Sequence, residues 1–302
     1  MLFYVLISSL IIIKTDGQKK GANTGREKMA RSIYKGECYE QVYKMDNFQI
    51  EYDDSKKEQN ICAVYCSSSG LYFPNTEEEF CKAFIDRDDK FEWKKQRVKR
   101  AYKHIWIRDI TKEFYVRGIN SKINSIDKLT DFIKKETEGY SAIFVGSSGG
   151  AYIATLLGCA LEADLVYNFS GFFDLNVLDE DTWPLIKERE YAVSNTKWYN
   201  LCELIRKSNT QVLYFYPNKL EGDRKQAELV KDIKNVHSFE FISKDHGIPF
   251  SDQALEKVIN MDFDMLYKKV EIFKGKRINV LLWNLYFKFL IHEGTTYGKT
   301  NI

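Results

Sequence analysis

Several features that mark common classes of protein are missing from this sequence. The six cysteines form no C-x-x-C pair and no histidine stands at zinc-site spacing, which argues against a metal site. Neither sign of charge dominates. Forty-five basic and 43 acidic residues leave a formal net charge of +2, so we expect no nucleic-acid partner. The chain shows no internal repeat, and its 44% hydrophobic content suffices for one large core.

The two ends of the chain are apolar. Residues 1–13 carry no charge but are too few to span a bilayer comfortably. They lack the basic leader and the cleavage site of a signal peptide, so a signal peptide, an anchor, a buried strand and a misassigned start all stay open. We expect an N-terminal segment and linker at 1–31, an α/β domain at 32–270, and a C-terminal apolar helix and tail at 271–302.

The C-terminal helix, expected at 280–291, must bury most of its surface. Packing on the domain is the first interpretation. A peripheral membrane contact or a partner protein is the second, helped by Lys274, Lys276 and Arg277 just before the helix, and the N-terminal segment could make a similar membrane contact.

The cysteines predict a reducing environment. Cys62 and Cys66 fall in an apolar strand and Cys159 in an apolar helix, positions where free cysteine behaves as a small apolar residue. We therefore expect a cytoplasmic protein, and association with a membrane stays open.

The most informative feature that is present is a serine bracketed by glycines. Val145-Gly146-Ser147-Ser148-Gly149-Gly150 directly follows an apolar run, and a G-x-S-x-G turn between a strand and a helix exposes the serine hydroxyl. Gly146 and Gly149 are expected to supply the small positions and Ser148 the nucleophile. An apolar helix at 151–160 and an amphipathic helix at 126–138 flank the turn and its strand, which indicates a βαβ arrangement.

A serine nucleophile needs a histidine base, and one of the four histidines is well placed. His246 follows the expected strand 237–242 in a loop that contains Gly247 and Pro249. His104, His237 and His292 are interpreted as structural.

The acid that orients the histidine is expected between serine and histidine in the chain. Asp223 lies after the expected strand 211–216 and before a helix at about 224–233, where it could also be a helix N-cap. Glu221, Asp232 and Asp245 are the alternatives.

Two backbone N–H groups should form an oxyanion hole. One is expected from Gly149 and the other from Ser68 or Ser69, in the loop after the strand 61–66. That strand is expected to pair with residues 47–52.

Substrate contacts are expected from two further segments. Asp109, Tyr115 and Arg117 follow the strand at 105–107, at the sheet edge where ligand contacts gather. Residues 174–208 are expected to form a helical lid, in which aromatic residues line a pocket or form a small core: Trp183, Tyr191, Trp198 and Tyr199.

On these residues, the stretch from about Ile61 to Phe250 resembles an α/β-hydrolase, with Ser148 at the elbow, Asp223 as the acid and His246 as the base. Val145 to Gly150, Leu156-Leu157-Gly158 and Glu221-Gly222-Asp223 also resemble bacterial enzymes that O-acetylate capsular polysaccharides. The resemblance implies a mostly parallel central sheet flanked by helices, with a helical lid insertion.

Three function classes follow from this interpretation. The first is a serine esterase or deacylase that works through an acyl-enzyme on a small-molecule or glycan ester. The second is an O-acyltransferase that modifies a bacterial surface polysaccharide, and the third is a non-catalytic hydrolase-like binding protein. No cofactor is expected, and acetyl-coenzyme A would be a co-substrate only for the transferase.

Overall fold

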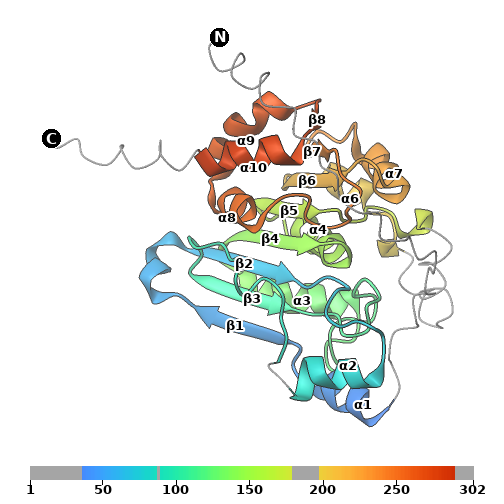
Figure 1. Cartoon of the computed structure of the whole chain (residues 1–302). Helices are drawn as coiled ribbons and strands as arrows, with labels where there is room; N and C mark the ends of the chain where they lie inside the picture. Colours follow the sequence, from blue (N-terminus) through green and yellow to red (C-terminus); the bar gives the residue numbers. More distant parts are fainter. Residues whose placement is uncertain (1–35, 87–88, 179–196, 290–302) are drawn as a thin grey trace.

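The fold is built on one mostly parallel sheet. The computed structural model describes residues 36–86, 89–178 and 197–289. In these residues, eight strands have the order β1-β3-β2-β4-β5-β6-β7-β8, and β1 alone runs antiparallel to its neighbour (Figure 1). The strands are β1 Phe48–Tyr52, β2 Ile61–Cys66, β3 Lys103–Ile107, β4 Ser141–Ser147, β5 Leu165–Phe169, β6 Gln211–Pro217, β7 Val236–Phe241 and β8 Arg277–Ile278.

Parallel strands must be covered on both faces, and short apolar runs form them here. β3 and β5 are buried at all five positions, and β2 and β4 at nearly all. The expected pairing of residues 47–52 with 61–66 is wrong, because β1 pairs with β3 and β2 lies between β3 and β4. β1 and β2 follow each other in the chain but are not neighbours in the sheet, and nothing in their composition signals the exchange.

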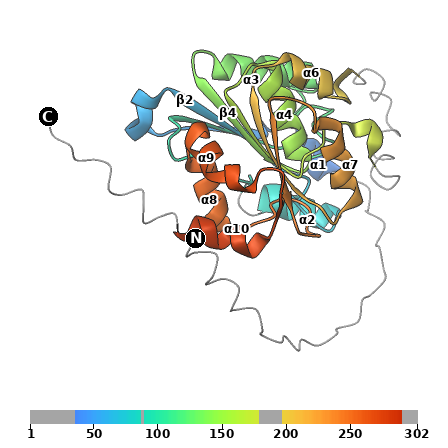
Figure 2. The same cartoon turned by 90° about the horizontal axis from the view of Figure 1, so that it is seen from above.

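Helices cover both faces of the sheet (Figure 2). α3, α4 and α6 lie on one side, and α8, α9 and α10 on the other, each side with its own apolar core. The helices are α1 Glu37–Lys44, α2 Glu77–Cys81, α3 Ile126–Thr137, α4 Gly149–Ala160, α6 Cys202–Lys207, α7 Glu221–Val230, α8 Asp252–Asn260, α9 Phe263–Val270 and α10 Val280–Phe289. Short helical turns are η2 Asp54–Gln59, η3 Lys82–Asp86, η4 Leu175–Val177 and η6 Glu271–Phe273.

Hydroxyl side chains start several of these helices. Ser125 and Ser251 accept a hydrogen bond from the backbone N–H three residues ahead, at α3 and α8. Such caps satisfy amides that a helix cannot pair by itself. The helix expected at 126–138 forms as α3, and the described part of the helix expected at 280–291 is α10.

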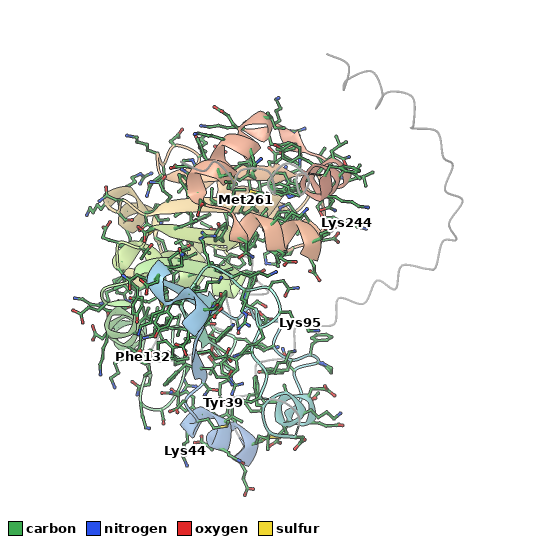
Figure 3. The ribbon with its side chains drawn as sticks, turned by 90° about the vertical axis from the view of Figure 1, so that its left-hand side faces the viewer. Tyr39, Lys44, Lys95, Phe132, Lys244 and Met261 are labelled. Atoms are coloured by element: carbon green, nitrogen blue, oxygen red, sulfur yellow. A yellow bond between two sulfur atoms is a disulfide. The ribbon has the colours of Figure 1, made fainter. Side chains whose placement is uncertain are left out.

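A third, smaller core joins α1 and α2 to the loop after β2. It contains Leu71 and Tyr72 of that loop, Phe80 of α2 and Tyr39 of α1. Figure 3 shows Tyr39 and Lys44 at the end of the molecule opposite Met261 and Lys244. Cys38 and Cys81 form a disulfide across this core, with their Cα atoms 6.0 Å apart.

The disulfide corrects the expectation drawn from the cysteines. Cys62, Cys66 and Cys159 are free and buried, as predicted. Cys38 and Cys81, however, are paired, and disulfides persist chiefly in oxidising compartments. Cysteine usage therefore gives no support to a reducing compartment.

The C-terminal helix packs on the domain through one face. Trp283 and Phe287 are buried in the same apolar core as α8. Other apolar side chains of the helix stay exposed: Leu281, Leu282, Leu285 and Phe289. Among the helices in the described ranges, none has the length and apolar character needed to cross a bilayer.

Residues 93–100 contain a run of basic side chains, several of which pair with acids. Lys94 and Arg97 both bridge to Glu51 of β1, and Lys99 bridges to Glu256 of α8. These pairs join the run to the body of the molecule, so it does not form an unpaired basic patch.

A buried histidine should make the fold sensitive to acid. His104 of β3 lies 3.0 Å from the Tyr65 hydroxyl, and burial lowers the pKa of its imidazole below the ordinary 6.5. His104 therefore binds a proton more readily in the unfolded chain than in the folded one. As the pH falls below about 6.5, this difference lowers the free energy of unfolding. We expect the urea unfolding midpoint of His104→Gln to fall less than that of wild type between pH 7.5 and pH 5. Parallel pH profiles for the two proteins would contradict this account.

Candidate active site

The turn between β4 and α4 holds Ser148 in a strained conformation. Its backbone has φ 53° and ψ −123°, a region that costs free energy for a residue with a side chain. Its N–H donates to the carbonyl of Phe169 on β5 (2.9 Å), and its carbonyl accepts from the N–H of Ala151 in the first turn of α4 (3.0 Å). These bonds fix the turn from the neighbouring strand and from the helix.

Two glycines allow the turn to form. A Cβ on Gly146 would lie 2.3 Å from the carbonyl oxygen of Gly150, and a Cβ on Gly150 would lie 2.3 Å from that of Cys66. Backbone cannot move aside as a flexible side chain can, so both positions require glycine. At Gly149 the nearest atom to such a Cβ is the Ser69 hydroxyl oxygen, at 3.1 Å. The expectation that Gly146 and Gly149 supply the small positions is correct for Gly146; the contact at Gly149 is looser, and Gly150, which was not singled out, is the second position that meets backbone.

Ser148, His246 and Asp223 form one hydrogen-bonded chain. His246 Nε2 lies 2.9 Å from Ser148 Oγ, and His246 Nδ1 lies 3.0 and 3.1 Å from the two carboxylate oxygens of Asp223. The three residues follow β4, β7 and β6, and the carboxyl ends of these parallel strands meet at one edge of the sheet. The Asp223 side chain is buried, whereas 36% of the His246 side chain is exposed. A carboxylate on Nδ1 leaves Nε2 to face the serine hydroxyl.

Asp223 lies inside a helix rather than before it. α7 begins at Glu221 with Leu220 as its N-cap, so Asp223 is in the first turn and does not cap the helix. A carboxylate there is stabilised by the positive end of the helix dipole.

The rival acids point elsewhere. Glu221 forms an ion pair with Lys225 on the exposed face of α7, and Asp232 and Asp245 are exposed. His237 belongs to β7, as expected. His104, expected just before the strand at 105–107, lies within β3, and His292 is outside the described residues.

A second serine positions the histidine loop. Ser170, after β5, has φ 51° and donates its hydroxyl hydrogen to the carbonyl of Gly247 at 2.7 Å. Gly247 has φ +106°, which a residue with a side chain adopts only with strain. The residue after the histidine is therefore tied to the strand beside the elbow.

The loop after β2 meets the start of α4, with Ser69 as the nearer serine. Gly149 is the first residue of α4, where backbone amides have no acceptor within the helix. Ser69 Oγ lies beside Gly149, whereas the Ser68 N–H donates to the Glu92 carboxylate at 2.6 Å. The Ser68 amide, one of the two alternatives for the second oxyanion donor, is already engaged.

Glu92 belongs to a segment that holds this loop, which sequence reasoning did not detect. Its second carboxylate oxygen accepts from the Ser68 hydroxyl at 3.0 Å, and the neighbouring Trp93 indole donates to the carbonyl of Cys66 at 3.2 Å. Lys90 Nζ donates to the carbonyl of Leu71. The carbonyls of Cys66 and Leu71 that accept these bonds, and the Ser68 groups that donate to Glu92, cannot be recognised as partners from residue types alone.

The segment at 109–118 reaches this edge with a different residue from those expected. The Asp109 carboxylate accepts from backbone amides of its own loop, and the Tyr115 hydroxyl donates to the carbonyl of Ser67 at 2.8 Å. Arg117 donates to the Tyr39 hydroxyl of α1 at 3.2 Å. These three side chains thus serve packing, and the expectation that they contact substrate finds no support. Phe114 is the residue beside the elbow, since its ring would lie 3.5 Å from a Cβ added at Gly149.

The expected lid falls mostly outside the described residues, including Trp183 and Tyr191. Its described part belongs to the main helical layer: α6 packs against α4, Trp198 and Tyr199 pack into the core of that face, and the Tyr152 hydroxyl donates to the carbonyl of Trp198. The aromatic residues at 198 and 199 are therefore part of a core.

Comparison with known proteins finds likeness in fold alone. A capsule O-acetyltransferase of Neisseria meningitidis serogroup A is 11% identical with a TM-score of 0.42, over 65% of this chain and 84% of that one. A lipase-esterase related protein from Clostridium acetobutylicum ATCC 824 is 12% identical with a TM-score of 0.42, over 75% and 99%. An esterase domain from Rhodothermus marinus is 11% identical with a TM-score of 0.38, over 64% and 81%. No protein-family model and no curated protein matches the sequence.

The fold is α/β-hydrolase-like. Its strand order, its strained serine turn after β4 and its histidine loop after the penultimate strand agree with the expected class. In the described ranges, no cluster of side chains could hold a metal ion.

The two glycines next to Ser148 should respond differently to alanine. Gly150→Ala forces a methyl group into the Cys66 carbonyl, so we expect a loss of at least about 1–3 kcal/mol in the free energy of unfolding. Gly149→Ala meets the Ser69 hydroxyl, which can rotate away, and the Phe114 ring at ordinary contact distance, so it should unfold close to wild type. Thermal and urea unfolding of both variants test this, and equal losses would contradict the packing described for the turn.

Proposed function

We propose that the protein is a serine-dependent acyl-transfer enzyme, most simply an esterase or deacylase. The observation that carries the proposal is the chain of hydrogen bonds from Ser148 Oγ through the His246 imidazole to the buried Asp223 carboxylate. A serine hydroxyl becomes a useful nucleophile near neutral pH when a base accepts its proton. A buried carboxylate orients that base and stabilises its protonated form.

The reaction would proceed in two steps. In the first, Ser148 Oγ bonds to the ester carbonyl carbon while its proton passes to His246 Nε2; the alcohol then leaves with that proton as its C–O bond breaks. In the second, water attacks the acyl-enzyme, His246 accepts the proton of the water, and Ser148 takes it back as the acid departs. The Gly149 N–H and Ser69 would stabilise the negative charge on the carbonyl oxygen in both steps.

The acyl acceptor separates the esterase from the O-acyltransferase. The three residues would serve either reaction, because a sugar hydroxyl can replace water in the second step. None of the described contacts favours a sugar over water, so hydrolysis is the proposed activity. Release of free acid from an aryl ester with no added alcohol tests it, and acetyl-coenzyme A with a glycan acceptor tests the alternative.

Covalent labelling tests the nucleophile. A fluorophosphonate should modify Ser148, since base activation makes this hydroxyl reactive, and Ser148→Ala should abolish labelling. Ser147→Ala is the matched control, because Ser147 precedes Ser148 and its hydroxyl is not part of the chain with His246. Mass spectrometry of the labelled peptide identifies the site. A wild-type protein that resists the probe, or labelling that survives in Ser148→Ala, would contradict the assignment.

Neutralising the acid tests the orientation of the histidine. Asp223→Asn removes the carboxylate that faces Nδ1, and we expect turnover to fall by about 10⁴-fold, as the same change does in a serine protease. Asp232→Asn makes the same chemical change on an exposed residue just after α7 and should keep full activity. Steady-state rates with an activated aryl ester provide the measurement. If Asp223→Asn kept most of its activity while folded, another group would have to orient His246.

A further inference from the structure

Strain is concentrated in the loop that follows β3. Lys112, Phe114 and Tyr115 all have positive φ, at 55°, 55° and 61°. Residues with side chains adopt this region at a cost, and such conformations cluster at functional sites, where the surroundings hold them in place. Three in a span of four residues need a strong constraint.

Asp109 supplies that constraint. Its buried carboxylate accepts hydrogen bonds from the N–H groups of Thr111 (2.9 Å), Glu113 (2.6 Å) and Tyr115 (2.9 Å), and from the Thr111 hydroxyl. The Asp109 carboxylate thus accepts from the backbone N–H groups of the residues on both sides of Phe114. The carboxylate and the strained backbone together determine where the Phe114 ring lies.

The ring lies between the elbow and a second phenylalanine. Phe114 is 6% exposed, and its Cδ1 would be 3.5 Å from a Cβ added at Gly149. It packs edge-to-face with Phe172, with ring centroids 5.2 Å apart, and the centroids of the Phe172 and His246 rings are 5.8 Å apart. Phe114 and Phe172 therefore form an apolar wall that extends from the start of α4 to the histidine.

We propose that Phe114, held by Asp109, limits the acyl group that the site accepts to a short chain such as acetyl. The proposal rests on the proposed function and names its substrate class. The carbonyl carbon bound to Ser148 would lie between Gly149 and His246, which are the two groups that the wall joins. A short acyl group fits beside the ring edges, whereas a long chain must displace a buried phenyl ring held by its neighbours.

Chain-length selectivity tests the wall. Phe114→Leu and Phe114→Ala should raise the ratio of kcat/KM for 4-nitrophenyl octanoate over 4-nitrophenyl acetate by about 10-fold or more, the effect of a methylene group or more in an apolar pocket. Asp109→Asn removes the charge that positions Phe114 and should move the ratio in the same direction. Phe239→Leu, which truncates a buried phenylalanine of β7 on the opposite face of the sheet, should leave the ratio unchanged.

The ratio separates this inference from a loss of stability and from the proposed function. A structural defect lowers the rates for the octanoate and acetate esters together and leaves their ratio unchanged. If Phe114→Ala fails to fold, Phe114→Leu still serves, because leucine fills most of the same volume. An unchanged ratio in folded, active Phe114→Leu would overturn the wall while the esterase proposal stands. If wild type hydrolysed neither ester and Ser148 resisted a fluorophosphonate, the proposed function would fail and the wall with it.

Discussion

The close approach of backbone at the start of α4 is the constraint on which the site depends. Gly150 packs against the carbonyl of Cys66 at the end of β2, and Gly146 packs against Gly150. This contact brings the first turn of α4 onto the loop after β2, and it leaves Ser148 with no relaxed conformation between strand and helix. The Ser148 turn and the loop after β2 therefore meet because two residues have no side chain.

The other loops are tied to this point by polar side chains. Ser170 holds the carbonyl of Gly247 beside the histidine, and Glu92 holds Ser68 in the loop after β2. Each bond spans a long distance in sequence and a short one in space, so the loops at the sheet edge are fixed to one another as well as to their strands. A hydrogen-bonded geometry such as that of Ser148 and His246 needs this fixation, because a shift of about 1 Å in a reacting group can cost 10²-fold in rate.

Local patterns predicted the parts of this architecture that depend on local sequence. Three local signals were sufficient to place Ser148, Asp223 and His246 at the same sheet edge. They are the glycines around the serine, the apolar runs that form the strands, and the loop positions of the acid and the histidine. The pairing of β1 with β3, the Cys38–Cys81 disulfide and the contact of Glu92 with Ser68 were not predictable in the same way. Each joins residues more than 20 positions apart whose types are equally suited to other partners.

Asp109 and Asp223 show why residue type at a sheet edge does not decide a role. Both are buried carboxylates in segments that follow parallel strands, and both were expected to contact either substrate or the histidine. The acceptor sites of Asp109 are filled by amides that its own loop presents, because Lys112, Phe114 and Tyr115 adopt left-handed conformations. Asp223 lies in a regular helix, where the amides point along the axis, and both of its oxygens face His246 Nδ1. The backbone conformation around a carboxylate thus decides whether it holds its own loop or orients another side chain.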